Sequence, residues 1–297
     1  MNLLITGAWE SGGKYREEIE KMGHTVKLGG KEDEPLATNG DWVEGLICSG
    51  SFFATHDIRD FPNLRYVQVE SAGLDKVPLD YVREHGIELH NARGVYSIPM
   101  AEYAVAGVLA LYKHLDAFRE KQKEHKWEKD RGLLELFGKT VLIVGCGSIG
   151  TECAKRFSAF GCRVVGVDAN PYETPYYERM SGLSELDEVL PMADVLVLSL
   201  PLMKETFHLM NAERLSLLKP SAVLVSMARG PIVDEEALVK ALPNIGGAVI
   251  DVFEQEPLSA ESPLWDMENV MITPHNSFVG ERNRARLDKV IMGNLKK

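Results

Sequence analysis

Short, unbroken runs of aliphatic residues, separated by helical patterns, constrain the fold of this chain more than any other feature. In a parallel sheet covered by helices on both faces, strands read as continuous runs rich in Val, Ile and Leu. Amphipathic stretches such as 14–22, 151–160 and 234–242 lie between the runs. The pattern therefore predicts an α/β fold with parallel strands. The expected strands form two series, 3–6, 45–49, 64–69 and 87–90, followed by 140–144, 163–167, 194–200, 222–226, 248–251 and 270–273.

An apolar segment separates the two series of strands. Ser97 can cap a helix that has Pro99 in its first turn, and residues 100–115 are rich in Ala, Val and Leu with almost no charge. A helix that is apolar on most sides is buried, either between domains or at a subunit contact. We therefore expect two domains in these 297 residues, with the crossing near this segment.

The charge balance argues against nucleic acid or an anionic membrane as the main partner. Lys+Arg 33 and Asp+Glu 44 give a formal net charge of −11, whereas both of those partners need clustered positive charge. No apolar run approaches the ~20 residues of a membrane span, and the N-terminus does not read as a secretory signal. The four cysteines form no C-x-x-C pair, which favours reduced thiols. We expect a soluble, cytoplasmic protein without a metal site, acting on a small molecule.

A glycine-rich loop joins one strand directly to a helix. The strand 140–144 runs into Gly145, Gly147 and Gly150, and the helical pattern 151–160 follows. In a dinucleotide-binding turn the first glycine permits the tight bend and the second lets a pyrophosphate approach the backbone. The third lets the helix pack on the strand. The whole context, and not the glycines alone, predicts a dinucleotide site.

The residues around this loop refine the prediction. The amides of Ser148 and Ile149, at the start of the helix, would bind the phosphates. Asp168 ends the next strand, where a carboxylate can accept hydrogen bonds from both ribose hydroxyls and would repel a 2′-phosphate. Residues 169–171 supply no arginine for such a phosphate. The sequence therefore favours NAD over NADP, with NADH as the reduced cofactor.

Polar residues follow several strands of the second series. In an open parallel sheet, ligands bind beyond the carboxyl ends of the strands, so residues that directly follow the strands should face one cleft. The segments concerned are 198–202, 225–230, 250–257 and 272–276, and the side chains expected in the cleft are Arg229, Asp251, Glu256 and His275.

The order of these motifs resembles that of a known family. A glycine loop, then Ala228-Arg229-Gly230, then D-V-F-x-x-E-P over 251–257, then Thr273-Pro274-His275, is similar to the D-isomer-specific 2-hydroxyacid dehydrogenases, which are NAD-dependent. The family includes D-lactate, D-glycerate, glyoxylate/hydroxypyruvate and phosphoglycerate dehydrogenases. The resemblance covers nearly the whole chain and is strongest from 140 to 276.

The resemblance implies an organisation for the molecule. Two Rossmann-like domains with doubly wound parallel sheets are expected, the substrate domain being discontinuous and built from 1–92 plus 276–297. The dinucleotide-binding domain would be 93–275, with a dimerisation helix and arm at 98–136, so that the protein would be a homodimer.

The resemblance also implies a catalytic trio of Arg229, Glu256 and His275 for hydride transfer between a D-2-hydroxy acid and its 2-oxo acid. A histidine titrates near neutral pH, so His275 suits the role of acid in reduction and base in oxidation. Glu256 would fix its tautomer and stabilise the imidazolium. Arg229 presents a planar, permanently charged fork that can hold the carboxylate and polarise the carbonyl oxygen.

Further residues are expected around the two ligands. The resemblance places Ser71, Ala72 and Gly73 over the substrate carboxylate. Phe52 and Met100 are candidates to shape the substrate side chain, in favour of a modest uncharged substituent over a phosphate, although core packing explains such residues equally well. Asp251 would accept a hydrogen bond from the nicotinamide amide. The remaining cofactor contacts are expected from Leu200, Pro201, Thr206, Met227, Ala228, Arg229 and His275.

Two alternative functions remain to be weighed. Formate dehydrogenases of the same family carry glutamine beside the histidine, so Glu256 argues against formate oxidation. An NAD-sensing, corepressor-like binding protein would keep the same trio, and the sequence leaves this alternative open. The sequence does not specify which 2-hydroxy acid is the substrate, nor the direction or the pathway.

Overall fold

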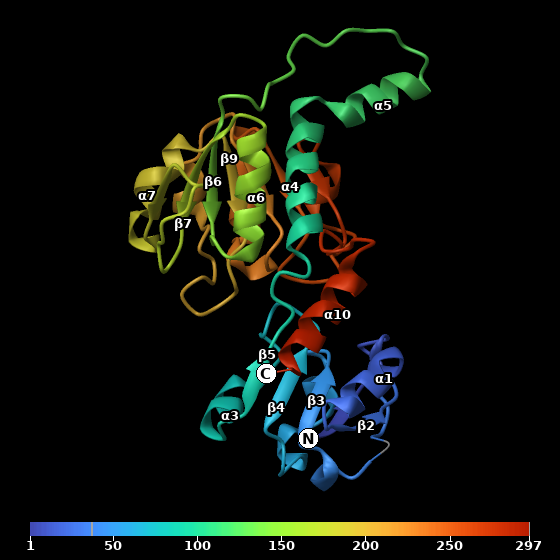
Figure 1. The fold of residues 1–297 in the computed structure, drawn as a ribbon. Helices are drawn as coiled ribbons and strands as arrows, with labels where there is room; N and C mark the ends of the chain where they lie inside the picture. Colours follow the sequence, from blue (N-terminus) through green and yellow to red (C-terminus); the bar gives the residue numbers. More distant parts are fainter. Residues whose placement is uncertain (37, 297) are drawn as a thin grey trace. The chain divides into compact units, whose positions relative to one another are not determined.

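A computed structural model describes residues 1–36 and 38–296. The chain forms two compact units, Met1–Tyr96 with Gly280–Lys297, and Ser97–Val279 (Figure 1). The expected organisation into one discontinuous and one continuous α/β unit is confirmed. The crossings fall after residues 96 and 279, whereas the sequence analysis placed them after 92 and 275. The first lies directly before α4, which begins at Ser97. No helix in the described part of the chain is both long and apolar enough to span a membrane.

The first unit contains a five-stranded parallel sheet in the order β2-β1-β3-β4-β5. Successive residues of β1 face opposite sides: Leu3 and Ile5 pack with one buried cluster, and Leu4 packs with another. Both faces are thus covered, as the aliphatic runs predict. The strands are β1 (Asn2–Ile5), β2 (Thr25–Leu28), β3 (Gly45–Cys48), β4 (Tyr66–Val69) and β5 (Glu88–His90), and the helices are α1 (Gly12–Lys21), α2 (Phe52–Thr55), α3 (Leu79–Glu84) and α10 (Asn283–Asn294).

The second unit contains a seven-stranded parallel sheet in the order β12-β11-β10-β9-β6-β7-β8. Because every pairing is parallel, all the carboxyl ends lie at one edge. The strands are β6 (Thr140–Val144), β7 (Arg163–Val167), β8 (Arg179–Ser181), β9 (Val195–Leu198), β10 (Val223–Ser226), β11 (Gly247–Ile250) and β12 (Val270–Ile272), and further helices are α6 (Ser148–Ala159), α7 (Leu186–Val189), α8 (Ala212–Ser216) and α9 (Glu235–Ala241).

The apolar helix predicted between the two series is α4 (Ser97–Tyr112), and more than half of its residues are buried. It packs against α6 and β11. Gly107 permits the close approach to β11, since a Cβ atom there would lie 2.5 Å from a methyl carbon of Val249. The expected N-cap role of Ser97 is wrong: Ser97 is the first helical residue, and its buried hydroxyl has no hydrogen-bond partner.

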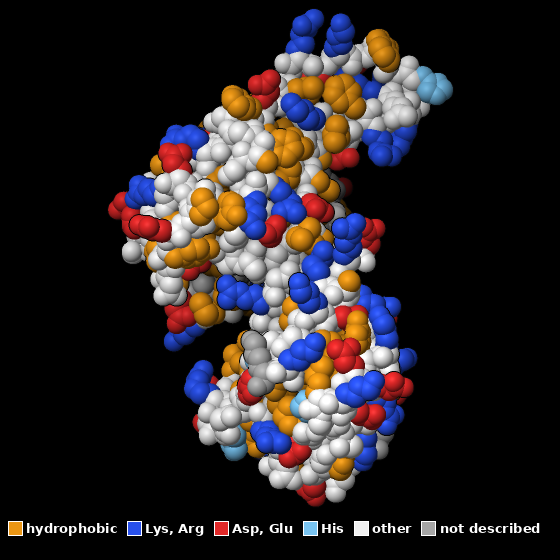
Figure 2. Space-filling model, viewed as in Figure 1, with side chains coloured by type: hydrophobic (Ala, Val, Ile, Leu, Met, Phe, Trp, Pro, Cys, Tyr) orange, Lys and Arg blue, Asp and Glu red, His pale blue; other side chains and the backbone are white. Residues whose placement is uncertain are grey.

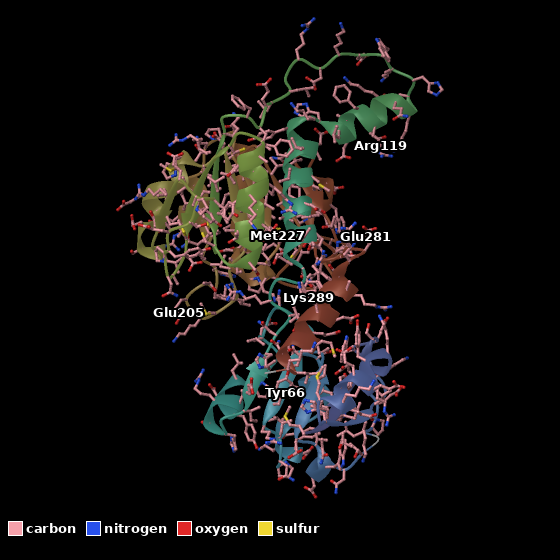
Figure 3. The ribbon with its side chains drawn as sticks, in the orientation of Figure 1. Tyr66, Arg119, Glu205, Met227, Glu281 and Lys289 are labelled. Atoms are coloured by element: carbon pink, nitrogen blue, oxygen red, sulfur yellow. The ribbon has the colours of Figure 1, made fainter. Side chains whose placement is uncertain are left out.

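A second helix, α5 (Leu115–Lys123), follows α4 and buries none of its residues. Figure 1 shows α5 and the segment after it extending away from the sheet of the second unit. Arg119 is labelled on this helix in Figure 3, and Figure 2 shows hydrophobic side chains on the surface of this region. Trp127 is 98% exposed and Phe137 76%. We call α5 and residues 124–138 the arm.

Candidate active site

The glycine loop connects β6 to α6 as predicted. Gly145 has φ +92°, and a Cβ atom there would lie 2.5 Å from the backbone nitrogen of Leu200. At Gly150 a Cβ atom would overlap the carbonyl oxygen of Gly145. Gly147 caps α6, and its Cβ direction opens into empty space. The loop therefore combines two positions that only glycine can occupy with one open face, which fits the approach of a phosphate.

The start of α6 supplies the donors for such a phosphate. The helix begins at Ser148, so the amides of Ser148 and Ile149 belong to the first turn, where no carbonyl of the helix can accept from them. The partial positive charge of a helix N-terminus adds to these donors. The chemistry of the loop therefore fits a dinucleotide.

Asp168 directly follows β7 and is half-buried beside the loop. Its Oδ2 accepts from the amide of Cys146 (2.8 Å), and its Oδ1 accepts from the amide of Asn170 (3.0 Å). The hydroxyl of Tyr172 donates to the carbonyl oxygen of Cys146 (2.6 Å). The residues after β7 thus hydrogen-bond both the amide and the carbonyl group of Cys146. The contact of this carboxylate with a ribose stays a prediction.

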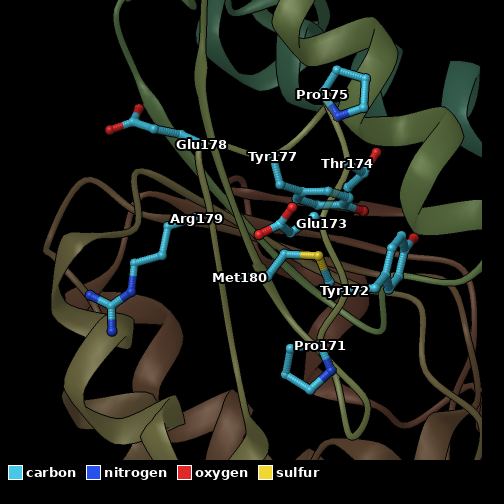
Figure 4. A pocket seen from close by; sticks show the side chains of 9 residues that line it. All are labelled: Pro171, Tyr172, Glu173, Thr174, Pro175, Tyr177, Glu178, Arg179 and Met180. Carbon is cyan, nitrogen blue, oxygen red and sulfur yellow. The ribbon is translucent and has the colours of Figure 1, made fainter.

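A cavity of about 750 Å³ lies along the same segment, lined by residues 171–175 and 177–180 (Figure 4). In this view the rings of Tyr172 and Tyr177 and the side chain of Met180 face the cavity. Its lining includes residues of β8, which is the edge strand opposite β12 in the sheet order. The cavity therefore belongs to the Asp168 side of the unit and not to the catalytic trio.

The three residues that the sequence predicts to be catalytic lie at another part of the same sheet edge. Arg229 follows β10, Glu256 lies in the loop after β11, and His275 follows β12. His275 Nδ1 lies 2.8 Å from Glu256 Oε2, and the two side chains are 39% and 38% exposed. The amide of Phe253 donates to Glu256 Oε1 (3.1 Å). Because a carboxylate accepts, the imidazole proton lies on Nδ1 and Nε2 is the nitrogen that can face a reacting group.

The backbone positions Arg229 beside the loop that carries Glu256. A Cβ atom at Gly230 would overlap the backbone of Phe253, so only glycine allows the two loops to pack this closely. Arg229 Nη1 donates to the carbonyl oxygen of Ala228 (2.8 Å). The Arg-Gly pair is thus explained by the contact between these two loops.

Asp251 has a structural task that the sequence did not predict. The side chain is fully buried. Its carboxylate accepts from the hydroxyl of Thr273 (2.5 Å) and from the amides of Asn276 (2.7 Å) and Ser277 (3.0 Å). A carboxylate has about four acceptor positions, so three are occupied by the turn that carries His275. The contact with the nicotinamide amide stays a prediction.

The other expected cofactor residues support the loop after β9 and the end of β10. Leu200 packs on Gly145, as described above. Thr206 is 1% exposed and donates to the carbonyl oxygen of Pro201 (2.8 Å). Met227 is also buried at 1%. These side chains shape the sheet edge, and any contact with a cofactor stays a prediction.

The residues expected around the substrate separate into a partly exposed group and a buried group. Ser71, Ala72 and Gly73 form a partly exposed loop after β4, in which the Ser71 hydroxyl donates to the carbonyl oxygen of Gly73 (2.8 Å). Phe52 is 1% exposed within a hydrophobic cluster. Met100, on α4 of the second unit, is 8% exposed. Their burial favours the core-packing interpretation that the sequence left open.

Two carboxyl groups that the sequence analysis did not single out lie near this loop. Glu70 directly precedes Ser71, and burial, reinforced by the charge of Glu32, raises its pKa to about 7. Glu32 Oε1 accepts from the amide of Ser49 (3.1 Å) and from the Thr6 hydroxyl. The carboxyl edge of the first sheet is therefore acidic. No sequence signal reveals this pair, because Glu32 and Glu70 lie 38 positions apart in unrelated segments.

The comparisons agree with the fold and the motifs. The family model described as "D-isomer specific 2-hydroxyacid dehydrogenase, NAD binding domain" matches residues 105–277. The glyoxylate reductase of Thermofilum pendens is 35% identical over 271 residues, which are 88% of this chain and 80% of that protein.

Solved structures extend the likeness to the whole chain. A D-isomer specific 2-hydroxyacid dehydrogenase from Xanthobacter autotrophicus in complex with NADPH and MES has a TM-score of 0.80 at 29% identity and covers 99% of this chain and 93% of its own. D-lactate dehydrogenase from Aquifex aeolicus, complexed with NAD and lactic acid, has a TM-score of 0.77 at 26% identity, with 99% and 94% covered. The chain therefore belongs to the D-isomer-specific 2-hydroxyacid dehydrogenase family, whose members carry out NAD-dependent oxidoreduction of hydroxy and oxo acids.

Proposed function

We propose that this protein reduces a small 2-oxo acid to its D-2-hydroxy acid with NADH, and catalyses the reverse oxidation. The observation that carries the proposal is the 2.8 Å hydrogen bond between His275 and Glu256, at the same sheet edge as Arg229 and in the same unit as the glycine loop. A glutamate-supported imidazole is the group that such a reaction needs for its proton.

Each of the three residues has a separate role in the proposed reaction. In reduction, His275 in its imidazolium form donates the Nε2 proton to the carbonyl oxygen and becomes neutral. In oxidation it takes the hydroxyl proton back. Glu256, fixed by the Phe253 amide, holds Nδ1 and stabilises the positive ring. Arg229 forms an ion pair with the substrate carboxylate and polarises the carbonyl bond toward its oxygen. A bound nicotinamide would supply or accept the hydride at the carbonyl carbon.

The cofactor would lie along the glycine loop, with its phosphates at the amides of Ser148 and Ile149 and its ribose at Asp168. A 2′-phosphate there would meet the Asp168 carboxylate, which supports a preference for NADH. Because a relative binds NADPH, the preference needs its own test. We expect Asp168→Ala to reduce the ratio of kcat/KM for NADH over NADPH by at least about tenfold, which corresponds to ~1.4 kcal/mol. An unchanged ratio would remove Asp168 from cofactor selection.

The substrate would place its carboxylate at the loop Ser71, Ala72 and Gly73. For the substrate side chain, a modest uncharged substituent is proposed over a phosphate. Formate is disfavoured, because it has no hydroxyl proton for a glutamate-supported histidine to remove. We also propose that the protein is a cytoplasmic homodimer that uses α4 and the arm.

A substrate panel tests the function. Glyoxylate, hydroxypyruvate, pyruvate, a branched 2-oxo acid and phosphohydroxypyruvate are each offered with NADH and with NADPH, and cofactor oxidation is followed by absorbance. We expect turnover of at least one unphosphorylated acid, with kcat/KM well above that for phosphohydroxypyruvate. A preference for the phosphorylated acid would reject the substrate class. Cofactor binding without turnover of any acid would favour the corepressor-like alternative.

A further inference from the structure

Two hydroxyl groups, those of Tyr103 and Thr273, link helix α4 to the turn that carries His275. The Tyr103 hydroxyl lies 2.7 Å from Thr273 Oγ1, and Thr273 Oγ1 lies 2.5 Å from Asp251 Oδ1. Thr273 has one hydroxyl proton and gives it to the carboxylate. Tyr103 must therefore donate to Thr273. Hydrogen bonds that run in one direction toward a carboxylate polarise and strengthen one another.

The carboxylate at the end of this series of hydrogen bonds holds the backbone on both sides of His275. Asp251 accepts from the side chain of Thr273 before the histidine and from the amides of Asn276 and Ser277 after it. The carbonyl oxygen of Asp251 also accepts from the amide of His275 (2.8 Å). One residue thus fixes the whole turn.

The turn needs such support because His275 has φ +48°. This left-handed conformation is uncommon for residues other than glycine, and it persists where the surrounding contacts over-determine it. The orientation of the imidazole toward Glu256 therefore depends on the contacts that Asp251 makes.

We propose that Tyr103 is a positioning residue for His275, acting through Thr273 and Asp251. The inference rests on the proposed role of His275 as acid and base. Tyr103 touches neither Glu256 nor the imidazole in any contact given above, so its effect is transmitted through the turn.

The surroundings of Tyr103 suit this role. The residue lies on α4, which packs against α6 and, through Gly107, against β11, so its hydroxyl is carried by a fixed helix. Burial raises the pKa of Tyr103 to about 12, outweighing the opposing effect of its hydrogen bond to Thr273. The phenol keeps its proton near neutral pH and remains a donor.

Tyr103→Phe removes the hydroxyl and keeps the ring. The matched control is Tyr112→Phe on the same helix, whose hydroxyl lies 3.4 Å from the carbonyl oxygen of Asp194. Asp194 precedes β9, so this control lies at the opposite, amino edge of the sheet. Both variants lose a part-buried hydroxyl from α4, so an effect of that loss alone should appear in both.

We expect Tyr103→Phe to lower kcat about 3–10-fold, the equivalent of losing one ordinary hydrogen bond, with an unchanged KM and Kd for NADH. The pH at which reduction falls to half its maximum should move down, because a looser turn weakens the contact with Glu256.

Thr273→Val should act at least as strongly, and Thr273→Ser, which keeps the hydroxyl, should restore activity. The double variant Tyr103→Phe/Thr273→Val should be no worse than Thr273→Val alone.

A second readout does not depend on turnover. In protein labelled with ¹⁵N-histidine, the His275 ring signals are identified by their loss in His275→Gln and titrated with pH. We expect the midpoint to move in Tyr103→Phe and to stay in Tyr112→Phe. If wild-type protein reduces no 2-oxo acid, the proposed function fails while the titration still decides the positioning. Tyr103→Phe that matches Tyr112→Phe in kcat, pH profile and titration would overturn the inference.

Discussion

At the scale of single residues, two of the histidine–glutamate pairs in the described part of the chain have similar geometry and different surroundings. His275 with Glu256 and His208 with Glu254 have similar separations, 2.8 and 2.9 Å, and both histidines have positive φ. His275 follows a strand at the sheet edge and is clamped by Asp251, whereas His208 lies in the loop after β9. We therefore propose a catalytic role for the pair at the sheet edge only, and a structural role for the other.

This contrast gives the first prediction. His275→Gln removes the proton donor, and we expect kcat to fall by roughly 10²–10⁴-fold, with the Kd for NADH from fluorescence titration nearly unchanged. His208→Gln is the matched control and should keep most of the activity. A His275 variant with wild-type kcat would contradict the proposed mechanism.

The carboxyl group of Glu70 gives a prediction on stability. Its pKa is about 7 in the folded protein against an ordinary value of 4.5, through burial first and the charge of Glu32 second. The folded state binds the proton more tightly, so this contribution to stability is complete below pH 4.5 and is lost as the pH rises through 7. Glu70→Gln has no proton to lose, so it avoids the cost of a buried charge and should stabilise the protein at pH 8 by on the order of 1–3 kcal/mol.

Thermal unfolding at pH 5 and pH 8 measures this effect. The gain in Tm over wild type should be clear at pH 8 and small at pH 5. Glu17→Gln, an exposed position on α1, should show no such dependence. An equal gain at both pH values would mean that the proton of Glu70 is not the cause.

At the scale of elements, sequence patterns predict the inner strands and one edge strand of each sheet, and miss the other edge strand of each sheet. β6 and β7 have the predicted bounds because buried central strands need uninterrupted aliphatic residues. β2 was not predicted, since only Val26 of its four residues is buried, and neither was β8, a three-residue edge strand. The motifs predict that Arg229, Glu256 and His275 follow neighbouring strands at one sheet edge, and the structure places them there. The link from Tyr103 to Thr273 spans 170 residues, and no local pattern reveals it.

The contact between α4 and β11 leads to a prediction at this scale. Alanine normally stabilises a helix relative to glycine by roughly 0.5–1 kcal/mol. At Gly107 the new methyl group would press on Val249, which is fully buried. We therefore expect Gly107→Ala to lower the stability by about 1–3 kcal/mol, the usual range for overpacking.

Gly293 on α10 offers the control, because a Cβ atom there meets nothing within 4 Å. Gly293→Ala should raise the Tm while Gly107→Ala lowers it. If both variants raised the Tm, Val249 would have room to move and the close packing of α4 would not require glycine.

At the scale of the whole molecule, the arm is an element without a core of its own. α5 buries no residue, and the segment after it exposes Trp127 almost completely. A contiguous exposed apolar surface on a protein commonly marks an interface. The proposed homodimer would cover this surface, because the arm continues directly from the apolar helix α4, which the resemblance assigns to dimerisation.

The last prediction concerns this assembly. Light scattering at micromolar concentration should give twice the mass of 33.0 kDa. Trp127→Gln together with Leu133→Gln should shift the equilibrium toward monomer, since burying each large apolar side chain contributes about 1.5–3 kcal/mol. Trp265→Gln changes another tryptophan, 52% exposed and far along the chain from the arm, and should leave the mass unchanged. A monomeric wild-type protein would show that the arm serves another partner, whereas dissociation by the Trp265 variant alone would place the interface elsewhere in the second unit.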